Sequence, residues 1–241
     1  MNIYIEGNIG SGKSTFLNIL KNRLTDEKQG KYSERISNGS YSFITEPVDE
    51  WLATTDNSGK NILEYFYEDQ NRWSFAFQMN SFISRVHRIQ NEKKSINFIE
   101  RSVFTDRYCF ARNCFTSGKI SEIEYKIYCK WNDWLVENFD IKPTAYIYLR
   151  TSPEVCSERI NGRNRNGEES IPLDYLKQLH DHHDDWLLRI EKNNNVPVLE
   201  IDVTNNYLDN EKDIETFIGH IENFINLVNN YKINNPTVTL N

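Results

Sequence analysis

The stretch YIEGNIGSGKST, residues 4–15, contains the pattern GxxxxGK[ST], which begins at Gly7 and ends with Gly12, Lys13 and Ser14. A strand-like IYI precedes the loop, and STFLNILKNRL follows it with the apolar spacing of a helix. In this context, glycines let successive backbone N–H groups point at phosphate oxygens, and the helix N-terminus adds the positive end of its dipole. The stretch therefore predicts a nucleotide-binding loop rather than a chance glycine-rich turn.

Two side chains of this loop have specific expected roles. Lys13 is expected to reach the β- and γ-phosphates, and the Ser14 hydroxyl is expected to ligate Mg²⁺. The loop predicts the nucleotide but leaves the reaction open. The loop residues expected to contact the nucleotide are Gly7, Asn8, Ile9, Gly10, Ser11, Gly12, Lys13, Ser14 and Thr15.

The remaining chain alternates strand-like and helical stretches. SFITEP, INFIE, TAYIYLR and VPVLEID read as strands, and helical patterns separate them. This order predicts an α/β fold with a five-stranded parallel sheet and helices on both faces. We expect one domain over residues 1–228, with a lid at about 161–171, and a loosely ordered Asn-rich tail over 229–241.

Composition excludes several function classes. The formal net charge of −7 over 241 residues argues against a general nucleic-acid-binding surface. No run approaches the roughly 20 apolar residues that span a bilayer, and the N-terminus begins directly with a strand-like stretch rather than a signal or transit peptide. The four cysteines form no CxxC pair, which favours reduced thiols. We therefore expect a cytoplasmic protein without membrane or nucleic-acid partners.

Two glutamates stand at predicted strand ends. Glu46 lies in TEPVDEW, and Glu100 lies in IERS, directly before Arg101. The carboxyl ends of parallel strands face the ligand crevice, so these side chains can take a proton from an attacking hydroxyl or hold Mg²⁺. A solvated loop charge is the alternative for a lone glutamate, but two equivalent positions favour a functional role.

The predicted long helix at about residues 69–91 carries a narrow polar line. Gln78, Ser81 and Arg85 are spaced by three and four residues, between aromatic and aliphatic side chains. A solvated face is normally wider and more charged. The line is either a partly exposed face or the wall of a pocket that reads a planar polar group such as a nucleobase.

Two polar stretches lie further along the chain. ERINGRNRNGEES places Arg159, Arg163 and Arg165 around a Gly/Asn segment. By itself the stretch is either a solvated basic turn or a lid that closes over phosphates, and the phosphate-binding loop elsewhere in the chain favours the lid. HDHHDD, residues 180–185, resembles a metal cluster, but its apolar flanks predict the polar face of an amphipathic helix.

Together the stretches resemble the deoxynucleoside kinases of the deoxycytidine/deoxyguanosine kinase group. The matching stretches, in family order from about residue 3 to 207, are IEGNIGSGKST, EPVDEW, NILEYFYED, RWSFAFQ, ERSVFTDRY, RINGRNRNGEESIPLDYL and EIDVTNNY. The resemblance implies a P-loop kinase fold, ATP and Mg²⁺, a deoxynucleoside substrate and a homodimer joined through helices. NNY departs from the acidic sequence expected at the donor's adenine.

The resemblance also implies residue roles. Glu46 matches the general base beside the 5′-hydroxyl, Glu100 matches the Mg²⁺-associated carboxylate, which is the alternative proton acceptor, and Arg101 matches the arginine that orients it. The other implied contacts fall into four groups, which bind the sugar, the base, the phosphates and the adenine of the donor. The sugar contacts are Tyr67 and Glu168, the base contacts are Gln78, Ser81, Arg85, Asp106, Val48, Trp51 and Phe110, the lid arginines are Arg159, Arg163 and Arg165, and the adenine contacts are Asn205, Asn206 and Tyr207.

The pair Arg85 and Asp106 bears on the substrate base. In the thymidine-preferring branch the counterparts are apolar or small, so the charged pair resembles the branch that takes deoxycytidine, deoxyadenosine or deoxyguanosine. We predict phosphorylation of a deoxynucleoside 5′-hydroxyl by ATP-Mg in nucleoside salvage. The alternatives are a thymidylate-type monophosphate kinase, disfavoured by the acids of EPVDEW, and a catalytically silent nucleotide-binding regulator. A GTPase is disfavoured because no NKxD motif occurs.

Overall fold

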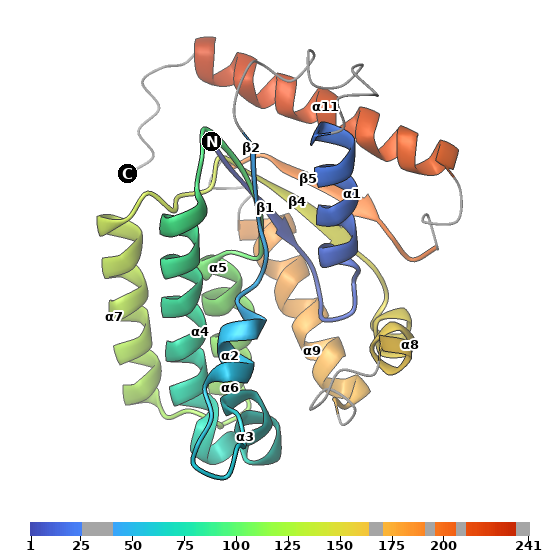
Figure 1. The fold of residues 1–241 in the computed structure, drawn as a ribbon. Helices are drawn as coiled ribbons and strands as arrows, with labels where there is room; N and C mark the ends of the chain where they lie inside the picture. Colours follow the sequence, from blue (N-terminus) through green and yellow to red (C-terminus); the bar gives the residue numbers. More distant parts are fainter. Residues whose placement is uncertain (26–40, 164–170, 191–195, 206–210, 235–241) are drawn as a thin grey trace.

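The computed structural model describes residues 1–25, 41–163, 171–190, 196–205 and 211–234. Its centre is an all-parallel sheet with the order β2-β3-β1-β4-β5 (Figure 1). The strands are β1 (Asn2–Glu6), β2 (Tyr41–Ile44), β3 (Ile96–Glu100), β4 (Ala145–Arg150) and β5 (Val198–Asp202). The predicted five-stranded parallel α/β fold is therefore confirmed.

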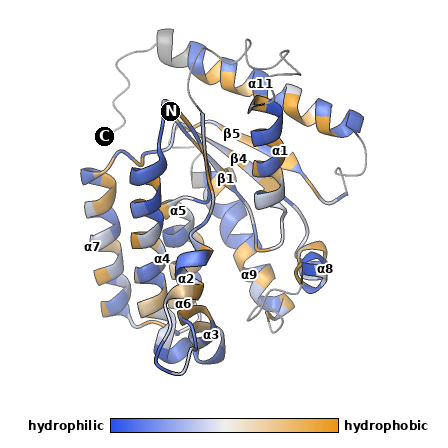
Figure 2. Cartoon of the chain, viewed as in Figure 1, coloured by the Kyte–Doolittle hydropathy of each residue, from blue (hydrophilic) through white to orange (hydrophobic). Residues whose placement is uncertain are grey.

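Helices cover both faces of the sheet, because side chains alternate along each strand. Ile3 and Ile5 of β1 pack on one face with apolar residues of two helices, and Tyr4 between them packs on the other face. The two helices on the first face are α1 (Lys13–Thr25) and α11 (Glu211–Asn234). The main helices on the opposite face are α4 (Gln70–Glu92), α7 (Glu122–Asn138) and α9 (Leu173–His183). Hydropathy colouring shows helices that carry both hydrophilic and hydrophobic residues, as a two-faced packing requires (Figure 2).

Shorter helices surround the carboxyl ends of the strands. They are α2 (Val48–Ala53), α3 (Ile62–Glu68), α5 (Val103–Thr105), the π-helical turn η2 (Asp106–Ala111), α6 (Arg112–Thr116), α8 (Pro153–Arg163) and the π-helical turn η3 (Asp184–Ile190). The sequence reading did not place α2 and α3 as helices. A capping box between Asn61 and Glu64 starts α3, and Trp51, Phe66 and Phe77 form a small separate core beneath both helices.

Two predicted boundaries differ from the structure. The predicted loosely ordered tail over residues 229–241 is helical at its start, because α11 continues to Asn234. Likewise, α8 extends to Arg163, so this arginine is helical rather than part of the predicted loop. The rest of the predicted lid, up to Ser170, lies outside the described residues.

Helix hydropathy and the state of the cysteines complete the description of the fold. No helix among them combines the length and the apolar character needed to cross a bilayer. The four cysteines are free, and Cys109, Cys114 and Cys156 are buried, as predicted for reduced thiols.

Parallel strands bring their carboxyl ends to one edge of the sheet. The glycine-rich loop follows β1, Glu46 follows β2, and Glu100 ends β3. In the strand order, β1 lies between β3 and β4, so the connections from β1 to β3 and from β3 to β4 run in opposite directions across the sheet. In open parallel sheets, ligands bind at the carboxyl ends of the strands where the direction reverses in this way.

Candidate active site

The glycine-rich loop has a backbone conformation that few residues other than glycine adopt. Gly7, Gly10 and Gly12 have φ angles of 146°, 80° and 91°. A Cβ atom on Gly7 would lie 2.6 Å from the Leu149 carbonyl oxygen, and one on Gly10 would lie 2.5 Å from that of Cys156. Both contacts are with backbone, which cannot move aside. The glycines are therefore required by the packing of the loop against β4 and α8 as well as by its turns.

Lys13 lies at the start of α1 and turns back over the loop. Its Nζ donates to the carbonyl oxygens of Gly7 at 3.1 Å and Asn8 at 2.7 Å. Burial lowers the pKa of Lys13 to about 7, and the positive charge of Arg101 contributes in the same direction. Within the described residues no carboxylate forms an ion pair with this ammonium group, and a phosphate group would supply a close anionic partner.

Ser14, at the end of the glycine-rich loop, is hydrogen-bonded to the end of β3. Its hydroxyl donates to Glu100 Oε1 at 2.7 Å, and Glu100 is buried. A hydroxyl and a carboxylate are oxygen ligands of the kind that Mg²⁺ prefers. The donor set at this point therefore fits a hard divalent cation.

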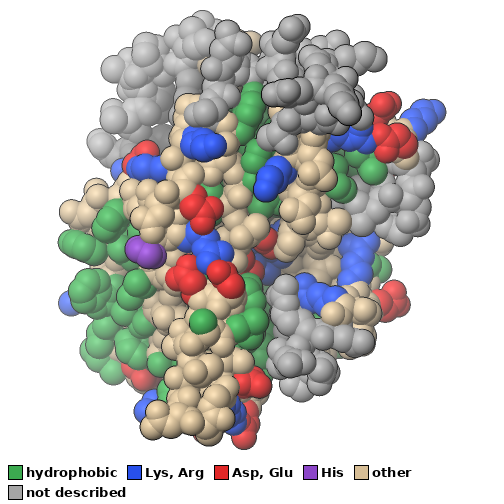
Figure 3. Space-filling view, in the orientation of Figure 1, with side chains coloured by type: hydrophobic (Ala, Val, Ile, Leu, Met, Phe, Trp, Pro, Cys, Tyr) green, Lys and Arg blue, Asp and Glu red, His purple; other side chains and the backbone are tan. Residues whose placement is uncertain are grey.

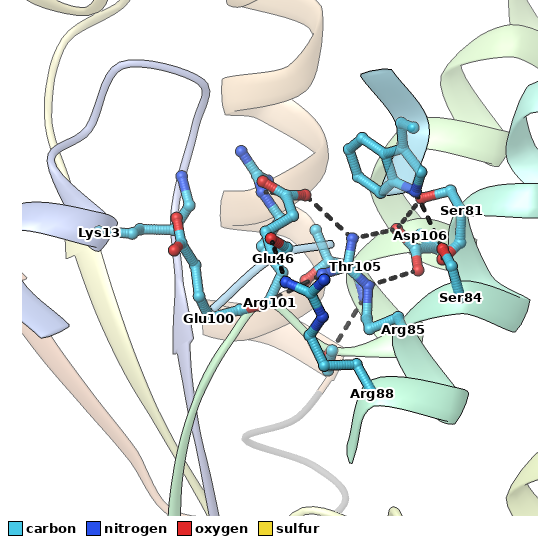
Figure 4. A network of polar contacts seen from close by, with 12 residues as sticks. Lys13, Glu46, Ser81, Ser84, Arg85, Arg88, Glu100, Arg101, Thr105 and Asp106 are labelled. Atoms are coloured by element: carbon cyan, nitrogen blue, oxygen red, sulfur yellow. Dashed lines mark hydrogen bonds and ion pairs between the residues drawn. The ribbon is translucent and has the colours of Figure 1, made fainter. Parts of the chain in front are cut away.

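Glu46 is held by two arginines from different elements. Its Oε1 lies 3.0 Å from Arg85 Nη2 of α4 and 3.3 Å from Arg101 Nε after β3 (Figure 4). Burial alone would raise the pKa of this carboxyl, but the charges of Arg101 and Arg85 outweigh it and lower the pKa to about 2. Glu46 is accordingly an ionised, oriented carboxylate and not a solvated loop charge.

Arg85 of α4 and Asp106 of η2 form a buried ion pair. Arg85 Nε donates to Asp106 Oδ2 at 2.9 Å, and Nη2 donates to Oδ1 at 3.1 Å. Arg85 also donates to the carbonyl oxygen of Glu100 at 3.2 Å, so its whole guanidinium group is engaged. Ser81 Oγ donates to Asp106 at 3.4 Å. The polar line of α4 is fully buried, which rules out the partly exposed face as its explanation.

A cavity of about 1060 Å³ extends from the glycine-rich loop to this buried pair. Gln78 lines it, is only 1% exposed, and neither of its amide atoms has a hydrogen-bond partner within the described residues. Trp51 and Phe110 also line the cavity. A buried, unsatisfied amide is costly, so a ligand with a hydrogen-bonding edge and planar faces complements this end of the cavity.

Arg101 adopts an unusual backbone conformation. Among the described residues other than glycine, it alone has a positive φ, of 61°, which costs about 1–3 kcal/mol. Buried Glu6 supports the turn, since it accepts hydrogen bonds from the Ser102 amide at 3.0 Å and from the Thr105 hydroxyl. The turn places the Arg101 guanidinium 4.8 Å from the centre of the Phe110 ring and beside Glu46.

The structure brings most of the predicted site residues to this one cavity. The predicted residues that line it are Ile9, Gly10, Gly12, Lys13, Ser14, Thr15, Glu46, Val48, Trp51, Tyr67, Gln78, Ser81, Glu100, Arg101, Asp106, Phe110, Arg159 and Arg163. Gly7, Asn8 and Ser11 belong to the loop without lining the cavity.

A few predicted residues lie elsewhere. Arg85 does not line the cavity, because its head group is buried against Glu46 and Asp106. Asn205 is exposed and away from the cavity wall, whereas its neighbour Thr204 lines it. The following predicted residues are outside the described part of the chain. They are Arg165, Glu168, Asn206 and Tyr207.

Sequence reasoning missed some residues of the wall. Arg88 lies one turn after Arg85 on α4 and lines the cavity, as does Tyr175 of α9. The spacing of three between Arg85 and Arg88 was the available signal for the first. A single tyrosine on a later helix gives no comparable signal.

The HDHHDD stretch is only partly a polar face. His183 is completely buried, its ring stacks on Tyr148 at 6.1 Å, and its Nδ1 lies 2.6 Å from the Leu179 carbonyl oxygen. Burial lowers the pKa of His183 to about 3, so the ring is neutral. No group of three His, Cys, Asp or Glu side chains in the described residues is arranged to hold a metal ion.

Comparisons with known proteins agree with the geometry. The sequence model of the family described as deoxynucleoside kinase matches residues 3–226. The chain is 37% identical to deoxycytidine kinase of Bos taurus, in an alignment that covers 92% of this chain and 90% of the relative. It is 35% identical to a probable deoxycytidine kinase of Fowlpox virus, over 92% and 87%. It is 31% identical to a mitochondrial deoxyguanosine kinase of Xenopus laevis, over 92% and 88%.

Proposed function

The chain belongs to the deoxynucleoside kinase family, and we propose that it acts on a deoxynucleoside whose base is cytosine, adenine or guanine rather than thymine. It is an ATP-dependent phosphotransferase of nucleoside salvage, similar to deoxycytidine and deoxyguanosine kinases. The observation that carries the base preference is that one cavity is lined by Asp106 of the buried Arg85–Asp106 pair and by the unsatisfied amide of Gln78. The monophosphate-kinase alternative would need basic groups for an acceptor phosphate where the site presents Glu46.

The base preference follows from hydrogen-bonding capacity. Asp106 and Gln78 both line the cavity, so its wall offers a carboxylate acceptor together with an amide that both donates and accepts. Cytosine, adenine and guanine each carry an exocyclic amino group that can donate to a carboxylate. Thymine has a carbonyl oxygen where cytosine has this amino group, so its ring N3–H is the one donor that its base edge offers to the wall. A thymine would therefore leave buried polar groups of the wall unpaired, which sites of this kind discriminate against strongly.

We propose that Glu46 accepts the proton of the 5′-hydroxyl. A carboxylate with a pKa near 2 is a weak base, so the proton moves late, when the hydroxyl oxygen has begun to bond to phosphorus. This timing fits the loose transition state of phosphoryl transfer, in which positioning and charge neutralisation dominate. Arg101 holds the carboxylate and has donors left for substrate oxygens.

The donor side neutralises the transferring charge. Lys13 gains a phosphate partner in place of carbonyl oxygens, and Arg159 and Arg163 of α8 face the same cavity. Arg159 Nη2 also donates to the Val203 carbonyl at 2.8 Å, which ties α8 to the loop after β5. We propose that Ser14 and Glu100 hold Mg²⁺, which when bound to ATP neutralises charge on the β- and γ-phosphates.

The test is a substrate panel. The protein is incubated with ATP-Mg and each of the four deoxynucleosides or dTMP, and mono- and diphosphate products are measured. We expect turnover of deoxycytidine or a purine deoxynucleoside at least ten times faster, in kcat/KM, than of thymidine. Thymidine preference would contradict the base assignment, turnover of dTMP alone would favour the monophosphate kinase, and ATP binding without any transfer would favour the regulator.

We further propose a homodimer and a cytoplasmic location. Large hydrophobic side chains are exposed on two adjacent helices, namely Ile83 on α4 and Ile123, Ile127, Trp131 and Trp134 on α7. Figure 3 shows hydrophobic side chains gathered on the side of the molecule where α7 lies. A second copy would cover this surface, and W131E/W134E should convert a dimer to a monomer in sedimentation.

The proposed cytoplasmic location is supported by the free cysteines, which suit a reducing compartment. Microscopy of a tagged protein tests this location.

A further inference from the structure

Arg88 contacts the backbone and the helix that carry Glu46. It lies on α4 with a side chain that is 12% exposed, and its Nη1 donates to the carbonyl oxygen of Glu46 at 3.3 Å. Its Nη2 donates to Asp49 Oδ2 at 2.7 Å and to Glu50 Oε1 at 2.9 Å, and its Nε donates to Glu50 Oε1 at 3.1 Å. One guanidinium group thus binds three residues of the segment that follows β2, and Figure 4 shows Arg88 beside Glu46.

The segment after β2 has little means of holding its own position. Pro47 precedes α2 without a side-chain cap, and α2 spans only Val48–Ala53. A helix of six residues is not stable by itself, so tertiary contacts must fix it. Some of those contacts come from α3, against which Trp51 packs, and others come from α4, where Ser84 accepts the Trp51 indole N–H at 2.9 Å and Arg88 binds the first turn.

Two arginines one turn apart hold the same glutamate from its two ends. Arg85 binds the Glu46 carboxylate at 3.0 Å, and Arg88 binds the Glu46 carbonyl at 3.3 Å. The position of a carboxylate depends on its backbone as well as on its side-chain partners. A displacement of about 1 Å at a reacting group lowers a rate by about 10²-fold.

A plain surface ion pair is the competing explanation. Asp49 is 71% exposed, and exposed pairs contribute little to stability. The bond to the Glu46 carbonyl is of another kind, however, because it restrains the backbone of the proposed proton acceptor, and Arg88 itself lines the cavity.

We propose that Arg88 is a positioning residue for phosphoryl transfer, which acts by fixing the main chain of Glu46 and the start of α2 against α4. The inference rests on the proposed role of Glu46. The two arginines of α4 then have different roles. Arg85 stabilises the negative charge of the Glu46 carboxylate, and Arg88 fixes the position of the Glu46 main chain.

The experiment measures kcat and both KM values for R88M and R88K, with R72M as the matched control. Arg72 is an exposed arginine of the same helix, 4.7 Å from the centre of the Trp73 ring and outside the cavity. For R88M we expect kcat to fall about 10- to 100-fold with the KM for ATP within twofold. R88K should recover only part of kcat, because its ammonium group keeps the charge but cannot reproduce the several contacts of the guanidinium group. R72M should have the same kcat as the wild type.

A double-mutant cycle with Glu46 separates positioning from a general structural effect. If Arg88 acts through Glu46, then R88M should cost less than threefold in an E46Q background, where the carboxylate is already lost. Equal costs in both backgrounds, or an equal loss of ATP binding, would overturn the proposal. If R88M fails to fold by circular dichroism, the cycle is run with R88K. A wild-type protein without deoxynucleoside kinase activity would instead overturn the proposed function.

Discussion

The donor and acceptor halves of the cavity are built in different ways. The donor half is built around one contiguous loop, the glycine-rich loop, whose lysine hydrogen-bonds to carbonyl oxygens five and six residues away, and Glu100 and the arginines of α8 complete it. The acceptor half is assembled from side chains of separate elements, with Arg85 bonding to Glu46 and Asp106, which are 39 and 21 residues distant in sequence. Local backbone geometry makes the first half, and a buried network of charges makes the second. Substitutions in the donor half should therefore affect function mainly, whereas those in the acceptor half should also affect stability.

The largest expected effect compares the carboxylates of the two halves. E46Q keeps the shape of the side chain and removes the proton acceptor, so kcat should fall about 10²- to 10⁴-fold with nucleoside KM little changed. E100Q alters the partner of Ser14, so it should raise the Mg²⁺ concentration needed for half-maximal activity. Steady-state kinetics with varied Mg²⁺ distinguishes them. A larger loss of kcat in E100Q at saturating Mg²⁺ would make Glu100 the proton acceptor.

Stability provides the next test of the comparison. R85M leaves Asp106 buried without its partner, so the free energy of unfolding should fall by about 3–5 kcal/mol. K13M removes a donor-half cation whose pKa burial already lowers, so its cost should be far smaller. Urea denaturation measures both. Similar costs for the two variants would contradict the division into a local and a network half.

A second variant checks that the ion pair itself causes the loss. R85M/D106L replaces both charges with apolar groups of similar size and should recover part of the stability lost in R85M. Because this double variant also removes the charged wall proposed to read the base, it should discriminate less against thymidine in the substrate panel. Recovery of stability without relaxed base preference would mean that Gln78 carries the discrimination.

The same division explains what the sequence could predict. The order of strands and helices and the whole donor loop follow from local patterns, because alternating periodicity and a contiguous motif specify them. Glu46 and Glu100 were found as carboxylates at strand ends, and the parallel sheet places them together. Gln78, Ser81 and Arg85 were found because a narrow polar line on a helix is unusual.

The features that escaped prediction depend on contacts distant in sequence. Arg85 bonds to Glu46 and does not line the cavity, because the loop after β2 packs against α4. The sequence gives no local signal of this packing. Arg88 and Tyr175 required the same packing information. The burial of His183 was missed because Tyr148, its stacking partner, comes from β4. Helix ends such as Arg163 and Asn234 were misplaced, since polar composition suggested a loop or tail where a helix continues.

A pH titration of stability tests the charge network more finely. The folded protein lowers the pKa of Glu46 from 4.5 to about 2, so the ionised carboxylate stabilises the fold above pH 4.5, and this contribution is lost as the pH falls toward 2. At 1.36 kcal/mol per pH unit the contribution is about 3 kcal/mol. The difference in unfolding free energy between wild type and E46Q should therefore shrink between pH 5 and pH 2. A constant difference would mean that the arginines do not hold an ionised Glu46.

The smallest expected effect tests the donor half by its protons. Without a ligand, burial lowers the pKa of Lys13 to about 7, so much of its charge is absent at pH 8. Triphosphate oxygens within reach of Nζ favour the charged form, so binding of ATP-Mg at pH 8 should take up close to one proton. Calorimetry in two buffers of different ionisation enthalpy measures this number, and K13R, which stays protonated, should show no uptake if it retains binding. Uptake should also disappear at pH 6, where Lys13 is already charged. Equal proton uptake at both pH values, or proton uptake in K13R, would assign the proton to another group. Lys13 would then not be the residue of the donor half whose charge depends on the bound nucleotide.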